Sequence, residues 1–68
     1  MNPEVFNLEL RQFLKKLGIT TQREVEQAVE KALKSGKLAG NETLRARAVV
    51  QIEGLPDQIT VTGDIKLG

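Results

Sequence analysis

The stretch that decides the fold runs from Ile19 to Leu38 and reads ITTQREVEQAVEKALKSGKL. Its apolar residues recur at the three- and four-residue spacing of one helix face, and they are Val25, Ala28, Val29, Ala32 and Leu33. Thr21 followed by Glu24 matches a capping box, in which each side chain accepts a hydrogen bond from a backbone N–H that has no helical partner. Gly36 suits the left-handed conformation that ends many helices. The stretch therefore predicts a helix over about residues 22–35.

A second helix is predicted ahead of this stretch. Asn2 is a favourable N-cap residue, and Pro3 fits the first helical position. The apolar stripe that follows consists of Phe6, Leu10, Phe13, Leu14 and Leu17. Because Gly18 can end a helix, we expect this one to cover about residues 3–17. Only residues 18–21 then separate the two helices, which predicts an αα-hairpin or a helix-turn-helix corner.

The apolar period changes to two after Thr43. This alternation predicts two strands, over about residues 44–53 and 58–67, each with its apolar residues on one face. Between them, Leu55 to Gln58 suits a type I turn because Pro56 has the φ that its second position needs.

The turn also predicts the register of the two strands. A four-residue loop places Ala48 opposite Gly63 and Arg47 opposite Asp64, and every inward-facing residue then meets an inward-facing partner. The predicted fold class is α+β, with element order α-α-β-β. We expect a single domain over residues 1–68, in which a two-helix hairpin packs on one face of an antiparallel β-hairpin.

Composition limits the classes of function. The chain has 68 residues, with ten basic and nine acidic side chains and a net charge of +1. This balance creates no field strong enough to attract nucleic acid or membranes by itself. A domain of this size buries only about 60% of the surface that its unfolded chain exposes. Since there is no cysteine or histidine for a disulfide or a zinc site, we expect stability to depend on helix packing or on association.

The same composition argues against catalysis. There is no His, Cys or Tyr, and the only serine, Ser35, stands at a helix end without a base. Glu26 and Glu30 lie one helical turn apart, but two carboxylates make neither a metal site nor an acid–base pair. We expect no enzyme, no cofactor, no bound metal and no small-molecule substrate.

The sequence also suggests a location. No apolar stretch approaches the roughly 20 residues that a membrane helix needs. The N-terminal MNPEVFNLEL lacks the basic start and apolar core of a signal peptide. The lack of cysteine is compatible with a reducing compartment. We therefore expect a cytoplasmic protein without a membrane segment.

The chain resembles a family of short bacterial proteins known only as a domain of unknown function. The resemblance rests on MNPEVFNLELRQ followed by FLKKLGITTQREVEQAVEKALKSGKLAGNETL. Its clearest features are the Gly18-Ile19-Thr20 segment, Arg23-Glu24, and the link from Gly40 to Thr43. It implies a bacterial, cytoplasmic setting and supplies no activity, ligand or site.

The favoured interpretation is a non-catalytic protein–protein interaction module whose partner is a protein, possibly itself in a homodimer. Four apolar residues outside the main stripes form the candidate interface, namely Val5, Leu8, Val49 and Leu55. A two-stranded sheet also has two open edges that can pair with another chain. Two copies would therefore join either by edge pairing or through the Val5 and Leu8 side of the first helix.

The alternative is a nucleic-acid-binding domain of partial winged-helix type. In it, the start of the second helix would read bases and the outer sheet face would contact phosphates. The candidate contacts are Thr21, Gln22, Arg23, Arg45, Arg47 and Lys66. Glu24, Glu26 and Glu30 on the second helix argue against it, because their charges would face phosphate.

Overall fold

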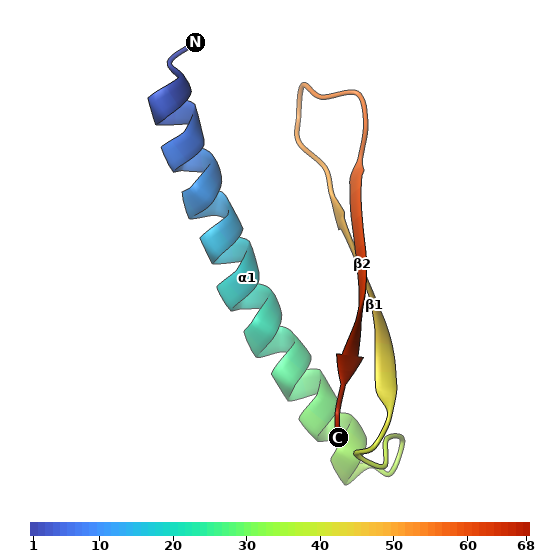
Figure 1. Cartoon of the computed structure of the whole chain (residues 1–68). Helices are drawn as coiled ribbons and strands as arrows, with labels where there is room; N and C mark the ends of the chain where they lie inside the picture. The colour runs from blue at the N-terminus through green and yellow to red at the C-terminus, as the bar shows by residue number, and fades with distance from the viewer. The chain divides into compact units, whose positions relative to one another are not determined.

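The computed structural model describes residues 1–68 as two compact units, Met1–Lys37 and Leu38–Gly68. The first unit holds one helix, α1, and the second holds an antiparallel hairpin of β1 and β2 (Figure 1). The predicted α+β class with a β-hairpin is confirmed. The predicted two-helix hairpin is wrong, because the chain has one helix. The packing of a helix on one face of the hairpin and the single domain stay predictions.

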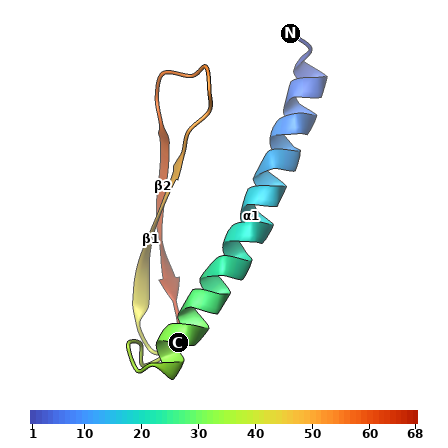
Figure 2. The ribbon, with the colours of Figure 1, turned by 180° about the vertical axis from the view of Figure 1, so that it is seen from behind.

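Helix α1 runs without a break over Pro3–Lys34, 32 residues, as both views of the ribbon show (Figures 1 and 2). At a rise of 1.5 Å per residue this is about 48 Å of helix. Asn2 caps its start as predicted, since its Oδ1 accepts hydrogen bonds from the N–H groups of Glu4 and Val5 at 3.0 and 3.2 Å.

The end of α1 is a Schellman motif. Gly36 has a φ of +79°, its N–H donates to the Leu33 carbonyl at 3.3 Å, and the Lys37 N–H donates to the Ala32 carbonyl at 2.9 Å. Two backbone carbonyls that lack a helical partner are thereby satisfied. The predicted role of Gly36 as the end of the helix is confirmed.

Gly18 does not end a helix, contrary to the prediction. A glycine inside a helix costs about 1 kcal/mol relative to alanine. A corner at Gly18 would expose up to four unpartnered C=O groups on one side and four N–H groups on the other. It would also leave two helices of about 15 residues each, a length that is marginal in isolation. Continuing the helical hydrogen bonds through Gly18 therefore costs less free energy than ending the helix there. Thr21 and Glu24 consequently lie in the helix interior and do not cap a helix start.

The hairpin consists of β1, Thr43–Val50, and β2, Ile59–Lys66. Both predicted strands are present, although β1 ends at Val50 and leaves an eight-residue loop at 51–58. The hydrogen-bonded turn lies early in this loop, where the Leu55 N–H donates to the Ile52 carbonyl at 3.1 Å. Gly54 there has a φ of +91°, which only glycine adopts readily.

This turn corrects the predicted register. Arg45 lies opposite Asp64, and Ala46 lies opposite Gly63, so the partners differ from the predicted ones by two residues. The cause is Gly54, which forms the turn ahead of Pro56 and lengthens the loop. Side chains alternate with a period of two, so this shift leaves every residue on its predicted face.

Neither unit by itself buries a side chain. A lone helix has no second element to pack against, and a two-stranded hairpin is marginal in water. The apolar residues of each unit therefore remain available for packing.

Candidate self-association surface

One apolar stripe follows the whole length of α1. We call it the helix stripe, and its members are Phe6, Leu10, Phe13, Leu17, Thr21, Val25, Ala28 and Ala32. Eleven residues complete three turns with about 20° to spare. Phe6, Leu17 and Ala28 therefore lie on the same face, and so do Leu10, Thr21 and Ala32. Seven residues of the two stripes predicted for separate helices thus lie along one surface with Thr21, whereas Leu14, Val29 and Leu33 lie to one side of it.

The two halves of the helix stripe differ in side-chain size. The N-terminal half is large, with Phe6, Leu10, Phe13 and Leu17, whereas the C-terminal half is small, with Thr21, Val25, Ala28 and Ala32. Phe6 and Phe13 are 53% and 45% exposed, respectively, so about half of each ring meets solvent. A partner that covered this surface would have to be small at one end and large at the other.

Charges of alternating sign border the helix stripe along one side. They are Glu9, Lys16, Glu24 and Lys31, each placed directly before a stripe residue, and we call them the charged flank. None of them forms an ion pair within the chain. The ion pair that does form, Glu30 to Lys34 at 3.1 Å, is exposed and joins residues one turn apart, so it contributes about 0.3–0.5 kcal/mol.

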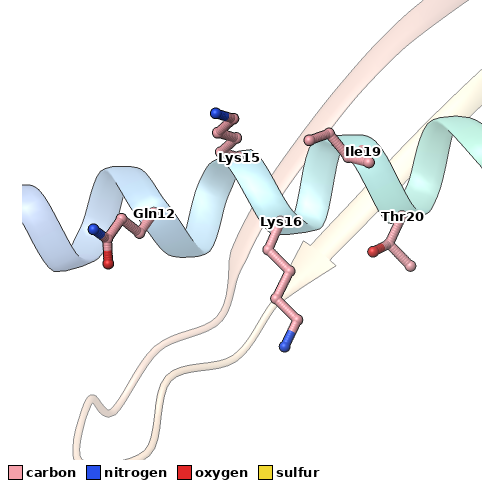
Figure 3. A pocket seen from close by; sticks show the side chains of 5 residues that line it. All are labelled: Gln12, Lys15, Lys16, Ile19 and Thr20. Atoms are coloured by element: carbon pink, nitrogen blue, oxygen red, sulfur yellow. The ribbon is translucent and has the colours of Figure 1, made fainter.

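A second apolar row lies off the helix stripe. Val5 and Leu8, both candidate interface residues, are 55% and 56% exposed. Ile19 lies eleven residues after Leu8 and hence on the same side, a position that the predicted corner concealed. A shallow hollow lies beside Ile19, and Figure 3 shows Lys15 and Ile19 on one side of the helix, with Lys16 and Thr20 on another.

The hairpin has one apolar and one polar face. The apolar face carries Leu44, Ala46, Ala48, Val50, Ile59, Val61, Gly63 and Ile65. The candidate interface residues Val49 and Leu55 lie elsewhere on this unit. Val49 lies on the polar face, opposite Thr60, and Leu55 lies in the loop with 57% of its surface exposed. The structure does not gather these two residues into one patch.

The residues of the nucleic-acid alternative occupy different surroundings from those predicted. Thr21, Gln22 and Arg23 lie in the middle of α1, so the helix start that would have read bases does not exist. The backbone N–H groups there are used within the helix and cannot bind phosphate. The partial winged helix therefore loses its corner and its recognition helix.

Arg45, Arg47 and Lys66 do share the polar face of the hairpin. Arg45, however, lies directly opposite Asp64, and Arg47 lies opposite the uncharged Thr62. A carboxylate between basic side chains lowers the positive potential that phosphate binding requires. No observation on this face favours nucleic acid.

The carboxylate of Glu42 organises the entry to the hairpin. Its two oxygens accept hydrogen bonds from the N–H groups of Ala39 at 2.8 Å and Gly40 at 2.9 Å. These bonds, led by the one from Ala39, hold the pKa of Glu42 below its ordinary value. The Glu42 carbonyl accepts a further bond from the Leu67 N–H at 2.9 Å. The short link before β1 is thereby tied to the end of the chain.

No helix combines the length and the apolar character that a membrane crossing requires. No three His, Cys, Asp or Glu side chains come together as a metal-binding group.

Comparisons with known proteins place the chain in a family. No curated protein and no solved structure matches it. A family model does match, over residues 1–68, and its description is a family of unknown function. This agrees with the resemblance to a short domain of unknown function. The chain therefore belongs to the family of unknown function DUF6494.

Proposed function

We propose that this protein is a non-catalytic interaction module that associates with another copy of itself through the helix stripe of α1. The observation that carries the proposal is that neither unit buries a side chain by itself, while α1 presents an apolar stripe from Phe6 to Ala32. Most of the stability of helices in proteins comes from packing of such a face. A covered stripe would supply the core that the single chain lacks.

Covering the helix stripe would stabilise the protein more than covering the second row or pairing the strand edges. Full burial of a Leu or Phe side chain contributes about 1.5–3 kcal/mol, and the large half of the stripe holds four such residues. The second row offers only Val5, Leu8 and Ile19, spread over the same length. Edge pairing of β1 or β2 adds backbone hydrogen bonds, each contributing about 0.5–1.5 kcal/mol net. The stripe is therefore the surface on which association depends most.

Two variants test whether the helix stripe or the row of Val5, Leu8 and Ile19 is the interface. Leu10→Glu places a charge within the helix stripe, and Leu8→Glu makes the same change on the second row. We expect Leu10→Glu to convert the associated form to a monomer in sedimentation equilibrium, because an unpaired buried carboxylate is costly. Leu8→Glu should leave the mass unchanged.

The controls separate dissociation from failure to fold. Far-ultraviolet circular dichroism reports whether α1 survives in each helix variant, and cross-strand contacts between β1 and β2, read by NMR, report whether the hairpin survives. If Leu8→Glu dissociates the protein and Leu10→Glu does not, the interface is the Val5 and Leu8 row. A third variant, Val49→Lys, changes the hairpin. If it dissociates the protein and neither helix variant does, the interface is the sheet.

The remaining expectations belong to the same proposal. A module of this kind needs no catalytic group, no cofactor and no membrane segment, and the sequence favours a cytoplasmic setting. Turnover of any substrate by the purified chain would contradict the non-catalytic part.

A further inference from the structure

We propose that two copies pair through their helix stripes in antiparallel orientation, an inference that rests on the proposed self-association. The helix stripe advances by steps of four, three, four, four, four, three and four residues. This series reads the same from either end, so a reversed copy can lie against the stripe with every layer in register. A twofold axis near Ile19 generates the pairing, as a symmetric dimer requires.

Size complementarity favours the antiparallel orientation. At the outer layers Phe6 of one copy faces Ala32 of the other, and Leu10 faces Ala28. Large side chains thus meet small ones, which fills a helix–helix interface evenly. In a parallel pair Phe6 would meet Phe6 and Ala32 would meet Ala32, so one end would be overfilled and the other left with voids.

The inner layers follow the same rule. Phe13 faces Val25, and Leu17 faces Thr21, on either side of the axis. The helix approaches its partner most closely here, next to Gly18. A Cβ at Gly18 would meet nothing within 4 Å in the chain itself, so the fold of the single chain does not require a glycine there. A close helix crossing gives the small residue a use.

Charge complementarity supports the orientation independently. In an antiparallel pair of helices, residues on one flank meet the same flank of the partner. Glu9 then faces Lys31, and Lys16 faces Glu24, so all four members of the charged flank gain a partner of opposite sign. In a parallel pair this flank would meet the other one, which carries Leu14 and Val29, and no opposite charges would meet.

A charge swap tests the pairing in the full-length chain. Glu9→Lys alone and Lys31→Glu alone each bring like charges together at two symmetric places, and we expect each to weaken the dimer by about three- to thirtyfold. The double variant restores opposite charges and should return the dissociation constant close to the original. Glu26→Lys, which makes the same change in charge on the face opposite the stripe, is the matched control.

Cross-linking gives a second readout. Because the chain has no cysteine, Glu9→Cys and Lys31→Cys each introduce a single thiol. A short bis-maleimide should join the two proteins when they are mixed and should join neither variant to itself. Efficient joining of Glu9→Cys to Glu9→Cys would show a parallel pair and overturn the inference.

The outcomes also distinguish this inference from the proposed function. A dimer that tolerates Glu26→Lys but is not restored by the charge swap would keep self-association and refute the antiparallel pairing. A monomer at all concentrations would refute both.

Discussion

Leu17 and Ala28 lie eleven residues apart on one face of a single helix, although Gly18 stands between them. Their alignment depends on α1 keeping its regular twist through the glycine, because each residue turns the helix by about 100°. A kink or a break at Gly18 would divide the helix stripe into two short surfaces with different directions. Whether Gly18 stays helical therefore decides whether the helix stripe is one continuous surface.

Alanine and proline at position 18 should change the free energy of unfolding in opposite directions. Gly18→Ala adds a Cβ that meets nothing within 4 Å in the single chain, so we expect the free energy of unfolding of the monomer, measured at low protein concentration, to rise by about 0.5–1 kcal/mol. Gly18→Pro should lower it by about 3 kcal/mol or more, because proline removes a helical hydrogen bond and clashes with the preceding turn. Urea unfolding followed by far-ultraviolet circular dichroism measures both. A Gly18→Pro variant that is as stable and as fully dimeric as the unaltered chain would mean that a corner exists there.

Alanine at Gly36 should lower the free energy of unfolding, whereas alanine at Gly18 should raise it. Its φ of +79° is unfavourable for any residue with a Cβ, so Gly36→Ala should lower the free energy of unfolding by about 1–2 kcal/mol. Gly18→Ala is the internal control, since both changes add one methyl group to the same unit. Stabilisation by Gly36→Ala would show that the helix continues past Ser35.

The hairpin register can be tested with Arg45 and Asp64. Asp64→Arg places two arginines opposite each other and should destabilise the hairpin by about 0.2–1 kcal/mol. Adding Arg45→Asp restores an opposite-charge pair and should recover the loss. Adding Arg47→Asp instead should recover less, because Arg47 lies opposite Thr62. Equal or better recovery with Arg47→Asp would favour a register shifted by two residues.

The Glu42 carboxylate predicts a response to acid. Because the pKa of Glu42 is lowered in the folded chain, its contribution to stability is present above the ordinary carboxyl pKa and is lost as the pH falls through the folded pKa. The amide shifts of Ala39 and Gly40 should titrate with a midpoint below the ordinary carboxyl value. In Glu42→Gln both should be insensitive over this range. A midpoint at or above the ordinary value would show that the two hydrogen bonds are absent in solution.

Local signals in the sequence were sufficient for the two ends of α1 and for the presence of the hairpin. Asn2 and Gly36 mark the ends of α1 because their capping geometries involve only neighbouring residues. The alternating residues after Thr43 indicated the hairpin and its two faces for the same reason. The fold class followed from these features.

What could not be predicted depended on competition between signals. Gly18 and the Thr21–Glu24 pair are typical of a helix end and a helix start, but the continuing backbone ladder outweighs them. Pro56 suits a turn, yet the turn forms at Gly54, which precedes Pro56 in the chain. The strand register is therefore shifted by two residues from the predicted one.

The candidate surface was missed for a related reason. Dividing α1 at Gly18 assigned the two halves of the helix stripe to different helices, so their common face and the charged flank went unseen. The candidate residues Val5 and Leu8 were chosen because they lie off the predicted stripes. The signal that was available is the eleven-residue repeat that links Phe6, Leu17 and Ala28 across the glycine.

Sedimentation equilibrium of the purified chain, over about a hundredfold range of concentration, shows whether the chain self-associates through the helix stripe. Self-association through the helix stripe predicts a mass of twice the 7.5 kDa of one chain, returning to 7.5 kDa in Leu10→Glu. A mass of 7.5 kDa for the unaltered chain at every concentration, with α1 intact by circular dichroism, would contradict it.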